Sequence, residues 1–486
     1  MIYPYLWIVV VGGFLAFATG AGVGMNDLSN AFGTTYGAKV LTLFQICVLA
    51  SVCEFTGAVL LGGAVTSTIS GGIASPENFR NYPYVFMYGM LCACGAAFVW
   101  LCLATWLVLP VSSTHSICGG VIGFALVFGG KDSVYWARRK DEFPYIGGVA
   151  PIVASWFISP VLTGLVSAGI YGLVRRYVLQ PENSFERAIQ TLPLIVSLTF
   201  FFEAFFVLYK GAGEKLQWGI TKTVLVSAAL ACVVGLAVWF FLPMFKRKLE
   251  SDGAVPPPVE EPAESGADSP AGSYDSPRKS ADSTEASAVV VNRDSFAEAP
   301  ASPTHASGMT VEIYGAAAEG VYRYLQVFTA VCASFAHGAS DVSNAVGPFA
   351  AMYSVYQKGT VDLNKETPKW ILALGGFGLI VGLSTFGCRL MRLLGEKLTV
   401  ITPSRGFSAE LSAALVVSFA SGYGIPVSST HCITGAVIAV SMLDVGAKNV
   451  RWGMVAKMYV GWVGTLFVTA FISATFFAQG IYAPIV

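Results

Sequence analysis

The hexapeptide Pro-Val-Ser-Ser-Thr-His occurs twice, at Pro110–His115 and at Pro426–His431, each time inside an apolar stretch. A second pair of related segments precedes these copies, GMNDLSNAFG from Gly24 and GASDVSNAVG from Gly338. The two copies lie 314 residues apart at their aspartates and 316 residues apart at their first serines. Because the offsets agree so closely, both motifs belong to one long internal duplication.

The composition predicts an all-α polytopic membrane protein. Of the 486 residues, 55% are hydrophobic and only 12% are charged, whereas soluble chains carry about 25% charged residues. The formal net charge is zero, so there is no electrostatic case for nucleic-acid binding. All ten cysteines lie in apolar segments without metal-type spacing, which argues against a zinc site or a disulfide framework.

Twelve apolar stretches are candidate membrane segments. They cover residues 2–24, 40–62, 84–109, 111–130, 146–174, 191–209, 219–245, 321–336, 369–388, 407–425, 427–444 and 452–483. Two of them begin with the proline and polar residues of the hexapeptide, and short interrupted segments at matching places in two halves predict two re-entrant helical hairpins. We therefore expect two repeats of about five to six segments each, an organisation typical of secondary transporters.

Three domains are predicted from the change in composition along the chain. Residues 1–245 form an N-terminal membrane half and residues 313–486 a C-terminal membrane half. Between them, residues 246–312 are rich in Ser, Pro, Ala, Glu and Asp, which is typical of a disordered linker. The basic run Lys246–Lys248 at its start favours a cytoplasmic location. We interpret the linker as a tether; regulation through serine phosphorylation is the alternative.

The aspartate motifs predict a cation site in each half. In a helix, Asp27 and Asn30 lie on one face, as do Asp341 and Asn344. Oxygen ligands with a single charge suit a hard cation such as sodium. The flanking glycines, together with Pro348, predict that the helix unwinds there and releases carbonyl oxygens as further ligands. An ionisable residue inside an apolar segment is costly, and its recurrence in register favours function over helix capping.

The hexapeptides predict an anion site. Serine and threonine cap helix N-termini, and proline favours the first turn. Such an N-terminus offers free N–H donors, hydroxyl groups and the positive end of the helix dipole. Two of them facing each other would hold a tetrahedral oxyanion through Ser112, Ser113, Thr114, Ser428, Ser429 and Thr430. We expect His115 and His431 to support these groups by hydrogen bonding rather than by proton transfer.

Two further carboxylates, Glu54 and Glu410, lie in apolar runs but do not correspond by the repeat offset. Each is predicted to bind a cation, carry a proton or pair with a residue such as Arg389. Glu203 and Lys210 are predicted to form a structural ion pair.

Several other classes are disfavoured by the motifs. An intramembrane aspartyl protease needs a GxGD setting, which Gly24–Asp27 does not provide, and the sequence contains no GxSxG nucleophile elbow. We therefore expect no enzyme activity. A channel stays open at this point, because sequence does not reveal gating.

The chain resembles the inorganic phosphate transporter family of sodium-dependent phosphate symporters. The resemblance rests on GMNDLSNAFGT, LASVCEFTGAVLLG, LPVSSTHSICGGVIG, SFAHGASDVSNAVGP, GFSAEL and IPVSSTHCITGAVI, and covers both halves but not the linker. Ser340 stands where the family pattern has an asparagine.

The resemblance implies sodium-coupled phosphate symport by alternating access, in a homodimer of inverted repeats at the plasma membrane. It implies phosphate binding at the two hexapeptides and a requirement for Glu54 and Glu410 in transport. Sodium is implied as co-substrate, with no other cofactor, at Asn26, Asp27, Asn30, Ser340, Asp341 and Asn344. Proton coupling, or another oxyanion such as sulfate, is the alternative within this class.

Overall fold

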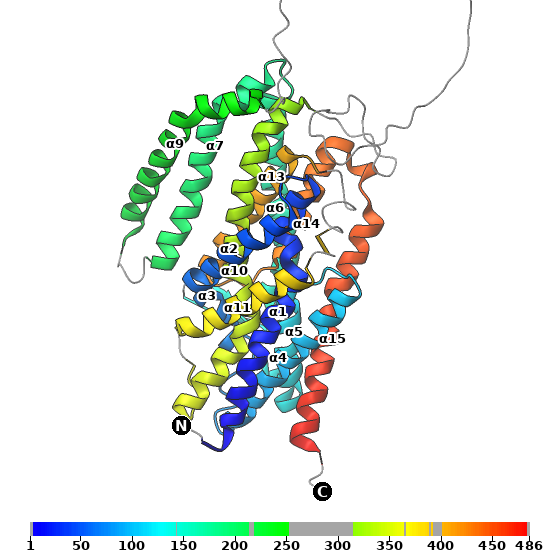
Figure 1. Cartoon of the computed structure of the whole chain (residues 1–486). Helices are drawn as coiled ribbons and strands as arrows, with labels where there is room; N and C mark the ends of the chain where they lie inside the picture. The colour runs from blue at the N-terminus through cyan, green and yellow to red at the C-terminus, as the bar shows by residue number, and fades with distance from the viewer. Residues whose placement is uncertain are drawn as a thin grey trace, which may run out of the picture.

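The structure is a computed structural model that describes residues 3–141, 143–212, 218–251, 314–363, 366–387, 390–391 and 401–483. Eight of the helices in these ranges are long and apolar enough to cross a membrane. Within the same ranges, the only sheet is a two-stranded ribbon. The chain is an all-α, multi-pass integral membrane protein, as its composition predicts (Figure 1).

The first half begins with a 3-10 turn at Tyr3–Tyr5 and continues with helices whose starts follow capping and turn signals. For example, Thr42 caps the second helix, where its hydroxyl accepts from Gln45 N at 3.4 Å and Gln45 Oε1 accepts from Thr42 N at 2.9 Å. The helices are α1 Leu6–Gly37, α2 Leu43–Leu61, α3 Gly63–Gly71, α4 Pro83–Trp106, α5 Ser113–Gly129 and α6 Val149–Val174. A 3-10 turn at Gly130–Ser133 and strands β1 Arg138–Arg139 and β2 Ile146–Gly147 join α5 to α6.

The second half has helices α10 Ala316–Lys358, α11 Lys369–Thr385, α13 Pro403–Gly422, α14 Ser429–Val445 and α15 Trp452–Tyr482, with a 3-10 turn at Ala447–Asn449. The predicted segment 321–336 is too short, because α10 continues for 22 residues beyond its end. The polar run around Asp341 lowers the local hydropathy without ending the helix.

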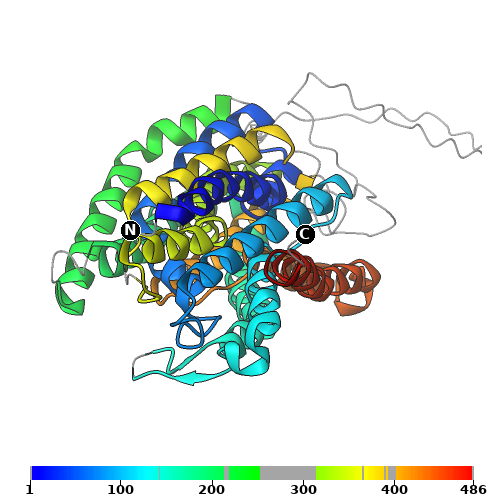
Figure 2. The ribbon, with the colours of Figure 1, turned by 90° about the horizontal axis from the view of Figure 1, so that it is seen from below.

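Helices α7 Ser184–Phe206 and α9 Ile220–Ser251 connect the halves and pack on each other. The π-helical turns Arg175–Leu179 and Val207–Ala212 flank α7. Seen from below, this pair lies at the edge of the bundle, away from α15 (Figure 2). Because α9 runs to Ser251, the start of the predicted linker is helical, and its remainder lies outside the described residues.

The packing of each half has a counterpart in the other half. Helix α1 packs on α11 and α4, whereas α10 packs on α2 and α13; likewise α5 packs on α15, and α14 on α6. The polypeptide runs upward through α1 and downward through α10 in Figure 1. This antiparallel relation is the one that inverted repeats require. The opposite crossing of a bilayer by the two halves, and the re-entrant character of α4–α5 and α13–α14, stay predictions.

The predicted unwinding at the aspartate motifs is wrong. Both α1 and α10 are continuous through their motifs, and α10 continues through Pro348. The glycines serve close packing instead. A Cβ at Gly24 would overlap the Leu379 carbonyl of α11, and one at Gly338 would overlap the Glu54 carbonyl of α2. Glycine is needed here because the backbones of neighbouring helices touch.

Candidate substrate and cation site

The centre of the molecule holds the two aspartate motifs, carried by α1 and α10. Asp27, Asn30, Asp341 and Asn344 are all buried. Within each motif the two side chains are bonded as the helical spacing predicts. Asn30 Nδ2 donates to Asp27 Oδ1 at 3.0 Å, and Asn344 Nδ2 donates to Asp341 Oδ1 at 3.2 Å.

The two hexapeptides form the N-termini of α5 and α14, which we call the first tip (residues 112–114) and the second tip (residues 428–430). Ser112 caps the first helix by accepting from His115 N at 3.3 Å, and Ser428 caps the second by accepting from His431 N at 3.4 Å. The predicted caps are therefore confirmed. The prolines lie two residues before each cap rather than in the first helical turn.

Each tip reaches the aspartate motif of the opposite half. Asn30 Nδ2 of the first half lies 3.3 Å from Ser429 Oγ and 2.9 Å from Thr430 Oγ1. Ser429 Oγ also donates to Asp341 Oδ2 at 2.7 Å. The second tip is thus bonded to both motif helices.

The reciprocal contact is present as well. Asn344 Nδ2 donates to Ser113 Oγ at 3.0 Å and to Thr114 Oγ1 at 3.2 Å. The tips also touch each other, because Thr114 Oγ1 donates to Val427 O and Thr430 Oγ1 donates to Val111 O. Neither half therefore forms this polar cluster alone.

Three buried oxygen atoms at the centre have no hydrogen-bond partner among the described residues: Asp27 Oδ2, Asn30 Oδ1 and Asn344 Oδ1. An unpartnered buried polar atom carries a desolvation penalty of about 1 to 3 kcal/mol. All three are oxygen acceptors, the ligands that a hard cation takes. The donor chemistry of the cluster therefore fits a bound cation.

His337 was not singled out by the sequence, yet it stands beside this cluster on α10. Its Nε2 lies 2.8 Å from Asp341 Oδ2, and its Nδ1 lies 3.2 Å from Glu54 Oε1 on α2. Asp27, His337 and Asp341 place one ligand atom each within 4.8 Å of one another. The four-residue spacing from Asp341, which puts both side chains on one helical face, was the signal that could have found it.

Glu410 lies apart from His337 and is surrounded by neutral donors. Its Oε1 accepts from Thr34 and Thr35 of α1, both at 2.5 Å, and from Gln326 Nε2 of α10 at 3.2 Å. Its Oε2 accepts from Thr329 Oγ1 at 3.0 Å. The predicted acid is therefore held between both motif helices, one turn beyond Asn30 on α1.

The side chains of Asn26 and Ser340, which the resemblance implies as sodium ligands, have different hydrogen-bond surroundings. Asn26 Nδ2 donates to Leu109 O at 3.1 Å and to Thr105 Oγ1 at 3.2 Å, and its Oδ1 accepts from Val111 N at 3.0 Å. Its amide is thus bonded to the chain that leads into the first tip. Ser340 makes no hydrogen bond of this kind within the described ranges.

The two hexapeptide histidines meet behind the tips. The rings of His115 and His431 are 4.8 Å apart, and each lies 4.0 Å from a tryptophan ring, Trp156 for His115 and Trp462 for His431. His115 Nδ1 lies 3.1 Å from Trp462 O. The supporting role of the two histidines through hydrogen bonds stays a prediction.

The remaining predicted ion pairs each include a residue whose side chain lies outside the described residues, so these pairs stay predictions. Glu203 is buried and accepts from Ser418 Oγ of α13 at 3.3 Å. The side chain of Lys210, its predicted partner, lies outside the described residues, as does Arg389. Glu54 has His337 as its partner instead.

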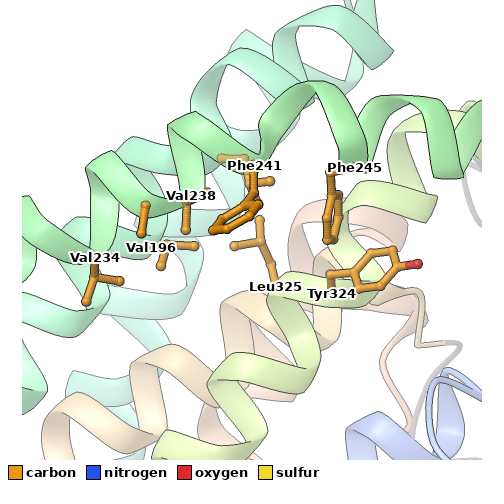
Figure 3. A pocket seen from close by; sticks show the side chains of 9 residues that line it. Val196, Val234, Val238, Phe241, Phe245, Tyr324 and Leu325 are labelled. Atoms are coloured by element: carbon orange, nitrogen blue, oxygen red, sulfur yellow. The ribbon is translucent and has the colours of Figure 1, made fainter.

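A separate pocket of about 320 Å³ lies between α7, α9 and α10. Figure 3 shows its lining of aliphatic and aromatic side chains, among them Val196, Phe241 and Leu325. An oxyanion requires several donors or cations, and this lining contains no cationic side chain and only one hydroxyl, that of Tyr324. The polar cluster at the tips is the candidate site.

Comparison with known proteins bears on the identity of this cluster. Residues 23–473 match the phosphate transporter family. The chain belongs to that family. The chain is similar to an inorganic phosphate transporter of Arabidopsis thaliana, named as chloroplastic, with 34% identity over 91% of this chain and 67% of that protein. A sodium-dependent phosphate transporter of Danio rerio is 28% identical over 98% of this chain and 95% of its own length.

A solved structure described as the sodium-dependent phosphate transporter superimposes on this chain. The TM-score is 0.76 at 30% identity, over 98% of this chain and 100% of the other. The family resemblance drawn from the motifs is confirmed.

Proposed function

We propose that this member of the phosphate transporter family moves inorganic phosphate across a membrane together with sodium, by alternating access between its two halves. The observation that carries the proposal is the crossed contact between tips and aspartate motifs, with three unpartnered buried oxygens at its centre. A carrier of this kind needs no catalytic residue.

Phosphate is proposed to bind between the two tips. The first N–H groups of a helix lack intrahelical partners and, with the helix dipole, attract anions. Ser113, Thr114, Ser429 and Thr430 add hydroxyl groups from both halves. These hydroxyls form hydrogen bonds with asparagines or with Asp341. When an oxyanion binds, hydrogen bonds to the anion would replace some of these bonds within the protein. Weak, lysine-free binding of this sort also permits release.

Sodium is proposed to bind at Asp27 and Asn30 and at Asp341 and Asn344. The coupling follows from electrostatics. Two unit charges about 5 Å apart repel by about 3 kcal/mol at the effective dielectric constant of a protein. An anion at the tips therefore meets a penalty from Asp27 and Asp341 unless cations are bound. Glu410, which accepts hydrogen bonds from three hydroxyl groups and one amide, is proposed as a further acid that transport requires, and Glu54 as another.

The decisive experiment is uptake of radiolabelled phosphate into proteoliposomes that contain the purified protein. We expect an inward sodium gradient to drive accumulation, choline to support none, and uptake to saturate with phosphate concentration. Linear uptake without accumulation would indicate a channel. Sulfate should compete poorly if a carboxylate accepts a hydrogen bond from the protonated oxygen of phosphate. Equal affinities for phosphate and sulfate would contradict the placement of phosphate beside the carboxylates.

Proton coupling is a second candidate, favoured by one observation. His337 lies between Glu54 and Asp341, and histidine is the side chain that changes charge near neutral pH. The same proteoliposomes, with an acid-outside pH gradient and no sodium, separate the candidates. Accumulation under that condition would support proton coupling.

A homodimer at the plasma membrane is also proposed, and it rests on the family resemblance alone. The mass of the purified protein, measured by light scattering with the detergent contribution subtracted, tests the dimer. A monomeric mass that nevertheless supports uptake would contradict it.

A further inference from the structure

We propose that Asn26 and Trp462 are positioning residues that fix the first tip, so that the second tip is the one that moves during transport. This inference rests on the proposed function, because it takes the two tips as the phosphate site. It assigns unequal mechanical roles to two segments with the same sequence.

The chain leading into the first tip is fastened at three consecutive residues. Asn26 bonds to Leu109 O and to Val111 N, at 3.1 Å and 3.0 Å. Between these two contacts, Trp462 Nε1 donates to Pro110 O at 3.1 Å. All the atoms involved belong to buried or partly buried groups, so water does not readily replace these bonds.

The chain leading into the second tip lacks both fastenings. The residue equivalent to Asn26 by the repeat offset is Ser340, which is too short to reach across and makes no bond to residues 425–427. The residue equivalent to Trp462 is Trp156, since each packs its ring 4.0 Å from a hexapeptide histidine. Trp156 Nε1 is buried and has no hydrogen-bond partner among the described residues.

The segment that leads into the second tip has fewer hydrogen bonds from side chains than its counterpart in the first half, and they lie farther apart along the chain. Thr68 of α3 donates to Gly424 O at 2.8 Å, and Thr114 donates to Val427 O at 3.2 Å. The second of these has its counterpart in the first half, where Thr430 donates to Val111 O at 3.4 Å. In the segments that lead into the tips, the difference is therefore the loss of the asparagine and tryptophan bonds at the second. The second tip itself carries one further bond, from Ser429 Oγ to Asp341 Oδ2.

An unpartnered buried indole N–H is costly in a static structure. It is useful in a moving one, because the second tip can gain a bond to Trp156 when it shifts. A shift that brings Pro426 O onto Trp156 Nε1 would reproduce the arrangement already present at Pro110. Among the described residues, the indole N–H of Trp156 is thus free to bond a second position of the second tip, whereas the equivalent N–H of Trp462 is already bonded at the first.

Matched tryptophan variants test the assignment. Trp462→Phe removes a bonded N–H, whereas Trp156→Phe makes the same chemical change and removes no hydrogen bond. We expect purified Trp462→Phe to bind radiolabelled phosphate roughly three- to tenfold more weakly at saturating sodium, the range for one lost hydrogen bond. Trp156→Phe should bind phosphate normally but slow transport, because the second position of the tip is lost. Equal phosphate affinities for the two variants would overturn the proposal.

The asparagine is tested by exchanging residues between the halves. Asn26→Ser should weaken phosphate binding at saturating sodium while the sodium concentration for half-maximal effect stays unchanged. If Asn26 is instead a sodium ligand, Asn26→Ser raises the sodium concentration for half-maximal effect and leaves the phosphate affinity at saturating sodium normal. That result would overturn the assignment of Asn26 as a positioning residue. Ser340→Asn should fasten the second tip and lower the transport rate.

Hydrogen exchange followed by mass spectrometry measures the mobility of the two tips independently of transport. We expect amides of residues 424–430 to exchange faster than those of residues 108–114, and Asn26→Ser to raise exchange in the latter segment toward the level of the former. Equal protection of the two tips in the wild-type protein would overturn this inference while leaving the proposed function intact. Absence of any phosphate binding by the wild-type protein would overturn the proposed function itself.

Discussion

The two extra carboxylates, Glu54 of the first half and Glu410 of the second, are both fully buried but are stabilised in different ways. Glu54 faces an imidazole, His337, which also contacts Asp341. Glu410 faces only neutral donors, three threonine hydroxyls and one amide. The two halves therefore share the motifs that are proposed to bind the substrate, whereas the charges around these motifs differ. The difference teaches that the halves are equivalent in shape and unequal in electrostatics.

The largest effect on transport is expected at the motif aspartates, where variants of the two halves can be compared directly. Asp27→Asn and Asp341→Asn should each abolish sodium-driven phosphate accumulation, a loss of about a hundredfold or more, because bonds to a charged group reach about 3 kcal/mol. Asp341→Asn should also lower the unfolding temperature more than Asp27→Asn, because it leaves His337 without one of its two acids. Sodium-stimulated uptake of normal size in either variant would remove that residue from the coupling site.

The Glu54 contact should behave as a buried ion pair. Removal of one partner from such a pair typically destabilises a protein by about 3 to 5 kcal/mol. We expect Glu54→Gln and His337→Gln each to lower thermal stability strongly, and the double variant to be less destabilised than the sum of the single variants. Thermal unfolding in detergent, followed by tryptophan fluorescence, measures this coupling. Additive losses would show that the two side chains act independently.

Variants of the two tips test whether both halves contribute equally to phosphate binding. Ser113→Ala and Ser429→Ala should each weaken phosphate binding by roughly tenfold to a hundredfold, and the double variant should be non-additive because both hydroxyls contact one ion. Ser116→Ala is the matched control, since that hydroxyl bonds only to Ser112 O of its own helix. Phosphate affinities unchanged by both tip variants would sink the proposed placement of the substrate.

Removal of a single hydrogen-bond donor to Glu410 should have a smaller effect on stability. Thr329→Val removes one neutral donor from the carboxylate, and we expect it to lower stability by about 1 to 3 kcal/mol. Thr66→Val is the control, because the Thr66 hydroxyl bonds to Gly62 O of its own turn. A Thr329→Val variant no less stable than the control would show that this donor does not hold the acid.

The smallest effect is expected in the segment that joins the halves. Residues 253–308 lack the apolar content for a core, so replacing them with a short flexible tether should leave phosphate affinity and transport rate nearly unchanged. Uptake measured at equal surface expression tests this. A tenfold loss would assign the segment a role in gating or docking.

Much of this architecture could be predicted because hydropathy and repetition report directly on membrane helices and duplicated sites. The apolar stretches, the caps at Ser112 and Ser428, and the pairing of each Asp with its Asn are all local properties of the sequence. Distant contacts were harder to predict. No local pattern links Glu410 to Thr34, nor Asp444 to Arg405 and Tyr171, which form a buried ionic cluster joining α14, α13 and α6.

The error at the aspartate motifs has a clear physical cause. Glycine weakens a helix and also admits a neighbouring backbone, and sequence alone does not separate the two effects. Here Gly24 and Gly338 admit α11 and α2. His337 was missed because a single histidine in an apolar helix carries no motif, although its spacing from Asp341 places it on the same face.

The crossed contacts between tips and motifs also constrain how such a chain can have arisen. A single ancestral half would have carried one aspartate motif and one tip, and each would have found its partner only on another molecule. Because the contacts are reciprocal, such an ancestor would have built the site only by pairing about a two-fold axis with an inverted second copy of itself. Fusion of two such copies would make the partnership permanent and allow each copy to change on its own, and Asn26 and Ser340 differ in that way.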